Sequence, residues 1–252
     1  MNTVLSMIIL IRQNTFKQDN TYIIADYILK HIDEIEGKSI QEIANECYVS
    51  TNTILRFCHT LGFQTFKMFK NTLISTIKTR TIQLTEKNKY LQIDDILKHI
   101  QNLVNEEFDI EKFQNQLDLI IEYILKYLHI HLYGAVFPLS LAQSFIEDMA
   151  LLGIDVDVHQ SCYRSQDLKQ DDGLHMVISF SGRFVEANRN EYNQILAMNY
   201  PKVLISHMNL NIGHVDVLLQ LPQTISSHYD DLLLLLIYDY ILLVLYHQKY
   251  GE

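Results

Sequence analysis

Residues 39–63 constrain the fold of this chain most, because their pattern is typical of two short helices joined by a tight turn. Ser39 can cap the first helix, and Glu42 follows three positions later, as a capping box requires. Ser50 is a second N-cap, and Gly62 ends the second helix. The sequence therefore predicts a helix-turn-helix arrangement.

The second predicted helix carries hydrogen-bonding side chains on the face away from its apolar residues. Side chains of this kind reach base edges and phosphates when a helix enters a major groove. An αα-hairpin in an ordinary helical domain would show the same pattern, and this alternative stays open. The candidate DNA-binding residues on and after this helix are Ser50, Thr51, Asn52, Thr53, Arg56, His59, Lys67 and Lys70.

Positive charge gathers near this helix, although the whole chain has a net charge of −10. Residues 1–90 hold 11 Lys and Arg against 8 Asp and Glu, whereas residues 91–252 hold 9 against 22. Between residues 56 and 89 there are 7 basic residues and one acidic residue, Glu86. DNA phosphates would be neutralised at this place, so charge and motif indicate the same function.

Composition excludes several other classes of protein. The 48% of hydrophobic residues can build a core, which argues against disorder. Cys47, Cys58 and Cys162 include no pair at metal-ligand spacing, which favours a reducing, cytoplasmic setting without disulfides. The apolar residues 4–11 lack the basic flank of a signal peptide, and the apolar run 232–246 is too short to span a membrane.

The chain predicts two domains of different character. Residues 1–78 form a helix-turn-helix domain, the polar residues 79–93 form a linker, and residues 94–252 alternate strands with helices. Such alternation favours parallel strands with helices on both faces of the sheet. The expected helices flanking and following the helix pair cover residues 21–35, 66–77, 93–108, 111–127, 138–152, 185–198 and 227–248, and the expected strands cover 129–133, 155–159, 175–180, 202–206 and 215–221.

In sheets of this type, small ligands bind at the carboxyl ends of the strands. Two loops occupy this position, residues 134–140 after the first strand and residues 179–183 after the third.

Residues 21–77 resemble the RpiR-type bacterial transcriptional regulators, which join an N-terminal helix-turn-helix to a sugar isomerase (SIS) domain. SIQEIA and VSTNTILRFCHTLGF are similar to the family's capping-box helix and its recognition helix with the closing Leu-Gly-Phe. One departure is Tyr48, because the family's turn usually carries glycine, which eases a positive φ angle. A slightly strained or reshaped turn is expected there.

From residue 94 to the end, the chain resembles the SIS domain, most clearly at the strand MVISFSG. This resemblance implies a doubly wound, flavodoxin-like α/β fold with a mainly parallel five-stranded sheet. It also implies a site for a phosphorylated sugar or amino sugar, since hydroxyls and free backbone N–H groups hold anions. The effector-binding candidates are Gly134, Ser140, Ser179, Ser181 and Gly182.

Three residues depart from the family's ligand loops. Pro138 has no N–H to donate, Val136 is branched, and Phe184 replaces a threonine. Two lost charge-assisted hydrogen bonds of about 1.5–3 kcal/mol each would weaken phosphate binding a hundredfold or more. A different ligand, weak binding or a pure dimerisation role therefore stays open.

Other polar constellations indicate no catalytic or metal site. His129 and His131 share one strand face, but no carboxylate or cysteine stands where it would complete a ligand set, so packing roles are expected. His207 and His214 flank a loop at a strand end and are expected to be exposed loop histidines.

The sequence thus predicts a cytoplasmic DNA-binding regulator of sugar metabolism, not an enzyme, that works as a homodimer or tetramer on an inverted-repeat operator. Its expected effector is a phosphosugar, and no cofactor, metal or membrane partner is expected. Three alternatives remain. One is a phosphosugar isomerase with a helical N-terminal extension, and another is a regulator whose SIS domain is only a dimerisation scaffold. The third is a sensor or scaffold protein that has lost DNA binding, which the departure at Tyr48 leaves open.

Overall fold

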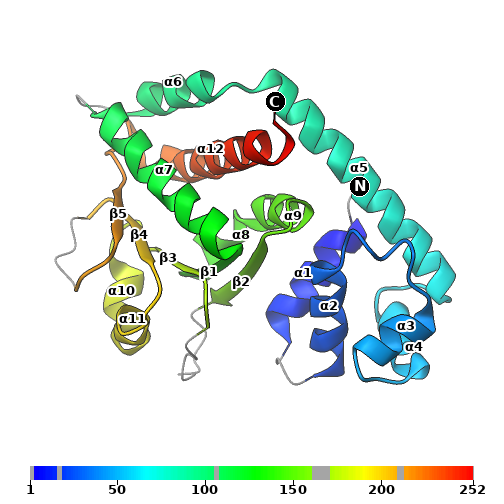
Figure 1. The fold of residues 1–252 in the computed structure, drawn as a ribbon. Helices are drawn as coiled ribbons and strands as arrows, with labels where there is room; N and C mark the ends of the chain where they lie inside the picture. Colours follow the sequence, from blue (N-terminus) through cyan, green and yellow to red (C-terminus); the bar gives the residue numbers. More distant parts are fainter. Residues whose placement is uncertain (1–2, 16–18, 105–107, 161–170, 209–212, 252) are drawn as a thin grey trace. The chain divides into compact units, whose positions relative to one another are not determined.

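Residues 3–15, 19–104, 108–160, 171–208 and 213–251 are described by the computed structural model of the chain. The chain divides into two compact units (Figure 1). Unit 1 comprises Met1–Lys87 with Ile146–Asp155, and unit 2 comprises Asn88–Phe145 with Val156–Glu252. This division does not test the predicted boundaries at 78 and 93, which stay a prediction.

Unit 1 is helical, as the sequence predicts. The helices from its N-terminal segment are α1 (Thr3–Asn14), α2 (Asn20–Lys30), α3 (Ile40–Glu46), α4 (Thr51–Thr60) and α5 (Phe66–Tyr90), which runs slightly past the unit's boundary. Helix α1 was not predicted as an element. It packs against α2, and its side chains Val4, Leu5, Ile8 and Ile9 are buried. One face of the apolar run 4–11 is therefore core, while Leu10 is exposed.

Helix α2 ends five residues earlier than predicted. His31, its C-cap residue, leaves the helical region at φ −119°, and its ring nitrogen Nδ1 lies 2.9 Å from the Tyr27 carbonyl oxygen. The Tyr27 and His31 rings also stack, with centroids 4.3 Å apart. Residues 31–37 form turns, although Ile32 and Ile35 remain buried.

Helix α5 continues through most of the predicted linker. Residues 79–90 are helical because no glycine or proline interrupts the chain between 66 and 90. Threonine hydroxyls donate back to carbonyls one turn earlier, as from Thr81 to Ile77 and from Thr85 to Thr81, both at 3.0 Å. The segment predicted as a linker is therefore mostly helical, and whether it links two domains stays a prediction.

The remaining elements alternate strands with helices. They are α6 (Ile93–Leu103), α7 (Ile110–Tyr127), β1 (His129–Gly134), α8 (Val136–Ser140), α9 (Gln143–Leu151), β2 (Asp155–Gln160), β3 (Leu174–Ile178), α10 (Arg183–Ala187), α11 (Arg189–Leu196), β4 (Lys202–Ser206), β5 (Val217–Gln220), a 3₁₀ turn (Ser227–Tyr229) and α12 (Asp230–Tyr250). The predicted helix 138–152 is divided into α8 and α9, and the predicted helix 185–198 into α10 and α11. Cys162 and residues 105–107 of the predicted helix 93–108 lie outside the described residues.

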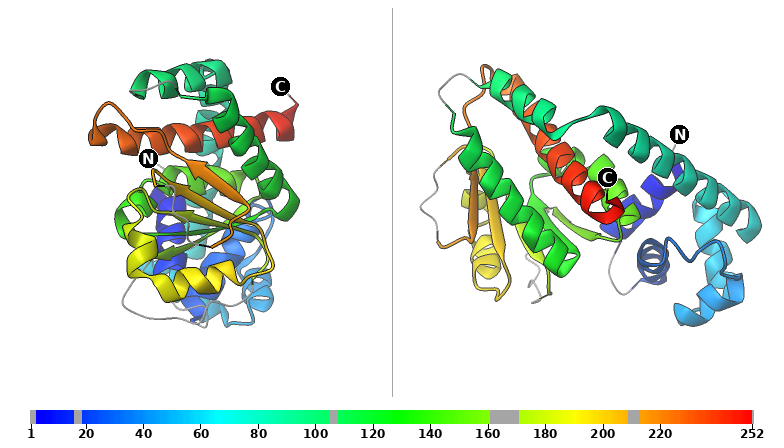
Figure 2. Two further views of the ribbon diagram at one scale, coloured as in Figure 1. Left: turned by 90° about the vertical axis from the view of Figure 1, so that its left-hand side faces the viewer. Right: turned by 45° about the horizontal axis from the view of Figure 1, so that its top comes forward.

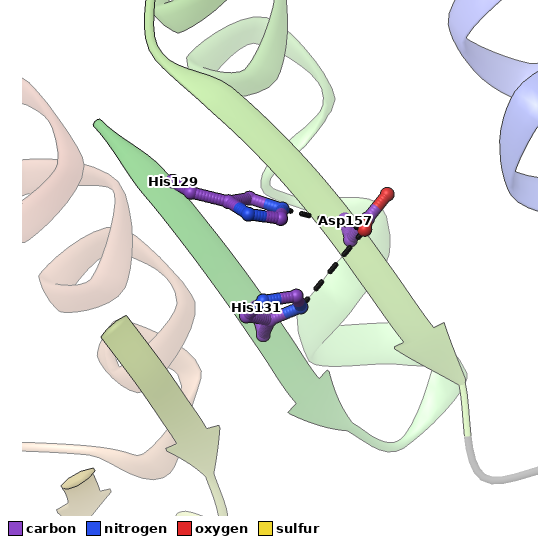
Figure 3. Close-up of side chains that lie close together, drawn as sticks. All are labelled: His129, His131 and Asp157. Atoms are coloured by element: carbon purple, nitrogen blue, oxygen red, sulfur yellow. Dashed lines mark ion pairs between the residues drawn. The ribbon is translucent and has the colours of Figure 1, made fainter. Parts of the chain in front are cut away.

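The sheet has five strands in the order β2-β1-β3-β4-β5, and β1, β3, β4 and β5 pair in parallel. Strand β2 runs in the same direction as β1 (Figure 3). The predicted doubly wound α/β fold is confirmed, because the strand order reverses between β1 and β3. Helices α10 and α11 cover one face of the sheet, and α7 and α12 lie on the other (Figures 1 and 2).

Helix α12 lies against α6 and α7 and buries most of its leucines. Neither α12 nor any other helix in the described part of the chain is long and apolar enough to span a membrane.

Candidate functional site

Helix α3 begins with the predicted capping box. The Ser39 hydroxyl accepts a hydrogen bond from the Glu42 N–H at 3.2 Å, and a Glu42 carboxylate oxygen accepts one from the Ser39 N–H at 2.7 Å. These hydrogen bonds hold the pKa of the Glu42 carboxyl below its usual range. Two N–H groups that a helix start leaves without partners are thereby satisfied.

The turn between α3 and α4 contains the strain expected at Tyr48. This residue adopts a φ of 55°, in the left-handed region, and it is 95% exposed. The next residue, Val49, donates its N–H to the Ala44 carbonyl at 2.8 Å, which closes the turn. The turn therefore keeps a tight geometry without glycine.

Helix α4 is fixed by a cap and by its buried face. The Ser50 hydroxyl accepts a hydrogen bond from the Thr53 N–H at 3.1 Å. Ile54, Phe57 and Cys58 are buried, and the Phe57 ring meets the Phe69 ring of α5 edge-on at 6.0 Å. The opposite side of α4 thus faces away from the core.

Most of the predicted DNA-contacting side chains lie on that outer side. Thr51, Asn52, Arg56 and His59 are exposed, and Thr53 is half-buried. His59 Nε2 lies 3.2 Å from the Gln64 carbonyl oxygen. Asn52 and Arg56 are four positions apart on one helix face, where a major groove would meet both.

Part of the basic run that follows has partners within the fold. Lys70 is half-buried and donates to the carbonyls of Glu36 at 3.0 Å and Lys38 at 2.8 Å. Two of its three N–H donors are thus used within the fold, and its contact with DNA stays a prediction. Lys78 Nζ lies 3.0 Å from a carboxylate oxygen of Glu36.

Arg80 has a different role from a phosphate contact. It forms two hydrogen bonds, at 2.7 and 2.9 Å, to the carboxylate of Asp148, whose side chain is 2% exposed. Burial raises the pKa of the Asp148 carboxyl, and Arg80 opposes this shift. The positive charge that remains on the surface next to α4 includes Arg56 and Lys67.

At the carboxyl ends of the strands in unit 2, two predicted ligand loops lie side by side, because Gly134 pairs with Ile178 in the sheet. Ser179 is 3% exposed, and its hydroxyl has no hydrogen-bond partner among the described residues. Gly182 is the N-cap residue of α10 and has a φ of 77°, in the left-handed region that favours glycine.

Arg183 belongs to this loop, and the sequence reasoning missed it. Its Nε donates to the exposed Ser181 hydroxyl at 3.0 Å. The sequence feature that could have identified Arg183 is its position directly after Ser-Gly at a strand end, because a guanidinium there can pair with an anion.

Gly134 and Ser140, the two effector-binding candidates in the first loop, both have roles within the fold. A Cβ on Gly134 would lie 3.1 Å from the Ile178 carbonyl oxygen and 3.3 Å from Leu139 Cγ, so glycine allows close packing there. The Ser140 hydroxyl donates to the Phe137 carbonyl at 2.7 Å. The apolar side chains of Val136 and Phe137 are exposed beside them.

His207 is not the exposed loop residue that was expected. It follows β4, its side chain is 18% exposed, and its ring lies 5.9 Å from that of Phe180. Its Nε2 is 3.3 Å from Asp230 Oδ1, which is within ion-pair range. Neither ring nitrogen forms a well-aligned hydrogen bond with any described residue. His214, by contrast, is exposed as expected.

The interpretation of His129 and His131 also needs correction. Asp157 of β2 supplies the carboxylate that the sequence did not reveal, 3.4 Å from His129 Nε2. The sequence around His129 and His131 could not show this carboxylate, because Asp157 belongs to another strand and only the sheet brings β1 and β2 together.

Comparison with known proteins identifies the helical N-terminal region. Residues 5–80 match the model of the helix-turn-helix domain of the rpiR family. An uncharacterized HTH-type transcriptional regulator of Haemophilus influenzae is 29% identical over 174 residues, which cover 65% of this chain and 60% of that relative. Another, from Caldanaerobacter subterraneus, is 32% identical over 82 residues, which cover 32% of this chain and 28% of the relative. The chain thus spans less than two thirds of the length of either relative.

Two solved structures align at low identity. One is the Vibrio vulnificus NanR protein complexed with ManNAc-6P, with 16% identity, a TM-score of 0.41, and coverage of 99% of this chain and 93% of that chain. The other is the hypothetical protein MJ1247 from Methanococcus jannaschii, with 18% identity, a TM-score of 0.45, and coverage of 63% and 91%. For MJ1247, a molecular function of 3-hexulose-6-phosphate isomerase has been inferred.

Proposed function

Because residues 5–80 are a helix-turn-helix domain of the rpiR family, we propose that this chain is a cytoplasmic DNA-binding transcriptional regulator. The observation that carries the proposal is the outer face of α4, where Asn52 and Arg56 are exposed above a buried core. Asparagine reads adenine edges and arginine reads guanine edges in a major groove. Lys67 would hold the adjacent backbone.

Two copies of the chain would act together. Paired recognition helices that enter successive major grooves lie about 34 Å apart, so the operator is expected to be an inverted repeat. A homodimer or tetramer supplies this symmetry.

The effector is proposed to be a phosphorylated sugar or amino sugar held at the ends of β1 and β3. Three features support this: the unpartnered hydroxyl of Ser179, the guanidinium of Arg183 beside Ser181, and the half-buried His207. A buried polar group without a partner is costly unless something satisfies it, and a hydroxyl-rich anion can do so. Such a ligand regulates only if it binds one arrangement of the two units better than the other.

The DNA-binding proposal is tested by the Arg56→Ala variant. Duplexes are selected from a random library with the wild-type chain, and affinities are measured by fluorescence anisotropy at several salt concentrations. The substitution should cost about 1–3 kcal/mol and relax the sequence preference at one position. The Arg189→Ala variant is the matched control, since Arg189 is an exposed arginine on α11, which belongs to unit 2 and not to the helix pair. Equal affinities of both variants and the wild type would contradict the role of α4.

The effector is tested separately by thermal shift with a panel of sugar phosphates and inorganic phosphate. A ligand should stabilise the wild type and the Arg189→Ala variant, and stabilise Arg183→Ala much less. If no sugar phosphate stabilises the wild type, the second unit is a dimerisation scaffold, and the DNA-binding proposal stands unaffected.

One observation favours the isomerase alternative, which is the His207–Asp230 pair at the strand ends. A histidine next to a carboxylate can transfer protons between the carbons of a sugar phosphate. Turnover of a ketose or aldose phosphate by the pure chain, lost in His207→Gln, would establish an enzyme. The regulator proposal predicts no turnover.

A further inference from the structure

A cluster of metal-ligand side chains lies outside the two sites described so far, on the edge of the sheet in unit 2 (Figure 3). His129 and His131 belong to β1, and Asp157 belongs to β2. His131 is 1% exposed, and the other two side chains are half-buried. The three side chains point toward one another between the two strands.

Strand geometry explains why these residues meet. His129 and His131 are two positions apart, so both point to the same face of the sheet, the face that Tyr133 shares with α10 and α11. Strand β2 is the edge strand next to β1, and Asp157 projects from it on that same face.

The distances suit one small ion. Asp157 Oδ2 lies 3.4 Å from His129 Nε2 and 3.9 Å from His131 Nδ1, and the cluster's ligand atoms all lie within 4.8 Å of one another. In a tetrahedral site with metal–ligand bonds of about 2.0–2.2 Å, neighbouring ligand atoms are about 3.4 Å apart. Small side-chain rotations would therefore bring all three ligand atoms to an ion.

The surroundings of His131 prepare it to be a ligand. Its Nε2 lies 3.2 Å from the Asp172 carbonyl oxygen, so a proton on Nε2 is donated there and leaves the Nδ1 lone pair facing Asp157. Gly173 leaves room for the ring, because a Cβ there would lie 3.0 Å from His131 Cδ2.

We propose that His129, His131 and Asp157 bind a divalent transition-metal ion of the zinc class. Two imidazoles and one carboxylate suit zinc, cobalt or nickel, whereas calcium and magnesium prefer oxygen ligands. His131 Nδ1, now 3.2 Å from His159 Nε2, exchanges that contact for the ion, and water occupies the open position. The ion ties the edge strand β2 to β1, its neighbour in the five-stranded sheet.

The test uses the full chain without a purification tag, stripped of metal by a chelator. Cobalt(II) is titrated while the visible absorption of tetrahedral cobalt is recorded, and zinc is then added to displace it. One ion per chain is expected. The His129→Gln and Asp157→Asn variants should bind at least tenfold more weakly, because each lacks one ligand and keeps a similar shape.

The His99→Gln variant is the matched control, since His99 is an exposed histidine on α6 outside the cluster. Its cobalt affinity should equal that of the wild type. If the wild type binds no ion stoichiometrically, or if all three variants bind like the wild type, the proposal is wrong.

A second measurement covers the case in which a variant folds poorly. Zinc in excess should raise the melting temperature of the wild type and His99→Gln, because a ligand bound only by the folded state stabilises it. It should raise the melting temperature of Asp157→Asn less, because that variant binds zinc more weakly. A zinc-induced shift of equal size in Asp157→Asn would overturn the proposal. Neither experiment involves DNA or a sugar phosphate, so their outcomes are independent of the proposed regulator function.

Discussion

The helix pair α3–α4 and the strand ends of unit 2 satisfy their polar groups in opposite ways. In the helix pair, Ser39 bonds to Glu42 and Ser50 bonds to Thr53, so each capping serine finds its partner three residues away. At the strand ends, the Ser179 hydroxyl and the His207 ring nitrogens have no aligned hydrogen-bond partner among the described residues.

The helix pair is thus a surface whose capping hydroxyls have partners within the fold. The strand ends are a site where polar groups have no aligned partner among the described residues. The helix pair needs nothing further to hold its shape, so Asn52 and Arg56 are presented on a preformed scaffold. The strand ends keep unsatisfied polar groups, which cost stability and are typical of places where another molecule binds. This contrast agrees with the proposed function, in which a preformed DNA-contacting surface is controlled by a ligand bound at the strand ends.

The largest effect is expected at the core behind the helix pair. Phe57 is 3% exposed and packs edge-on against Phe69, so Phe57→Ala should lower the free energy of unfolding of unit 1 by about 3–5 kcal/mol. DNA binding should be lost with it. Urea denaturation followed by circular dichroism measures the change.

Tyr90→Ala is the control for this substitution, because Tyr90 is 77% exposed at the end of α5. Its free energy of unfolding should stay close to that of the wild type. A small effect of Phe57→Ala, equal to that of Tyr90→Ala, would mean that the helix pair does not depend on its own core.

Acid should affect the sheet more than the helix pair. Burial, together with the nearby charge of His131, lowers the pKa of His175 to about 4, against about 6.5 in an unfolded chain. Because the folded state resists protonation, this stability is present above pH 6.5 and is lost as the pH falls toward 4. The loss should reach about 3 kcal/mol. Hydrogen exchange at β1 and β3, compared with α3 and α4 in the presence of a chelator, measures it.

His175→Gln isolates this contribution. Glutamine keeps a polar group near Tyr133 Oη, which lies 3.0 Å from His175 Nδ1, but it cannot be protonated. The acid-induced loss of protection in β1 and β3 should therefore be smaller in the variant. An identical pH profile would exclude His175 as the cause.

The same substitution at two serines tests the comparison directly. Ser50→Ala removes a helix cap and should cost about 1 kcal/mol. Ser179→Ala removes a buried hydroxyl that has no described partner, so the free energy of unfolding should stay constant or rise. Urea denaturation of both variants measures the difference. Equal losses would show that the Ser179 hydroxyl is already satisfied, for example by water, and that the strand ends are as complete as the helix pair.

How much of the structure the sequence predicts depends on whether a polar group finds its partner nearby in the sequence or in a distant segment. Caps and turns are determined within a few residues, and Ser39, Glu42 and Ser50 therefore revealed both helices of the pair. The parallel five-stranded sheet was predictable because buried strands and helices alternate. The partner of a side chain from a distant segment was not, and this is why Asp157 beside His129 was missed.

The extent of the basic surface also depends on contacts that the sequence does not show. Within the basic run 56–89, Arg80 is paired with Asp148, and Lys70 with two backbone carbonyls. These partners lie far away in the sequence. Positive charge in the sequence thus marks a candidate DNA-binding surface, which stays a prediction, while the extent of that surface depends on tertiary contacts.

The smallest effect is expected at the turn between α3 and α4. It tests whether the backbone of the helix pair is as free of strain as its capping residues indicate. Tyr48 has a φ of 55°, where a residue with a Cβ is less stable than glycine by about 1–2 kcal/mol. Glycine in turn loses more backbone entropy on folding, about 0.5–1 kcal/mol. Tyr48→Gly should therefore raise the free energy of unfolding by about 0.75 kcal/mol, which is the difference between the midpoints of these two ranges.

Tyr48→Ala separates the backbone from the ring, because alanine keeps the Cβ and the side chain of Tyr48 is 95% exposed. Its stability should match the wild type, whereas only glycine relieves the strain. Leu128→Gly is the corresponding substitution in unit 2, since Leu128 follows α7 and has a φ of 52°. The Leu128 side chain is only 50% exposed, so its replacement by glycine also loses buried apolar surface. If Tyr48→Gly raises the free energy of unfolding more than Leu128→Gly does, the exposed tyrosine is retained for a requirement other than folding. A surface next to the recognition helix is where such a requirement would arise. If Tyr48→Gly destabilises the chain, the turn is not strained, and the helix pair is complete in its backbone as well as in its caps.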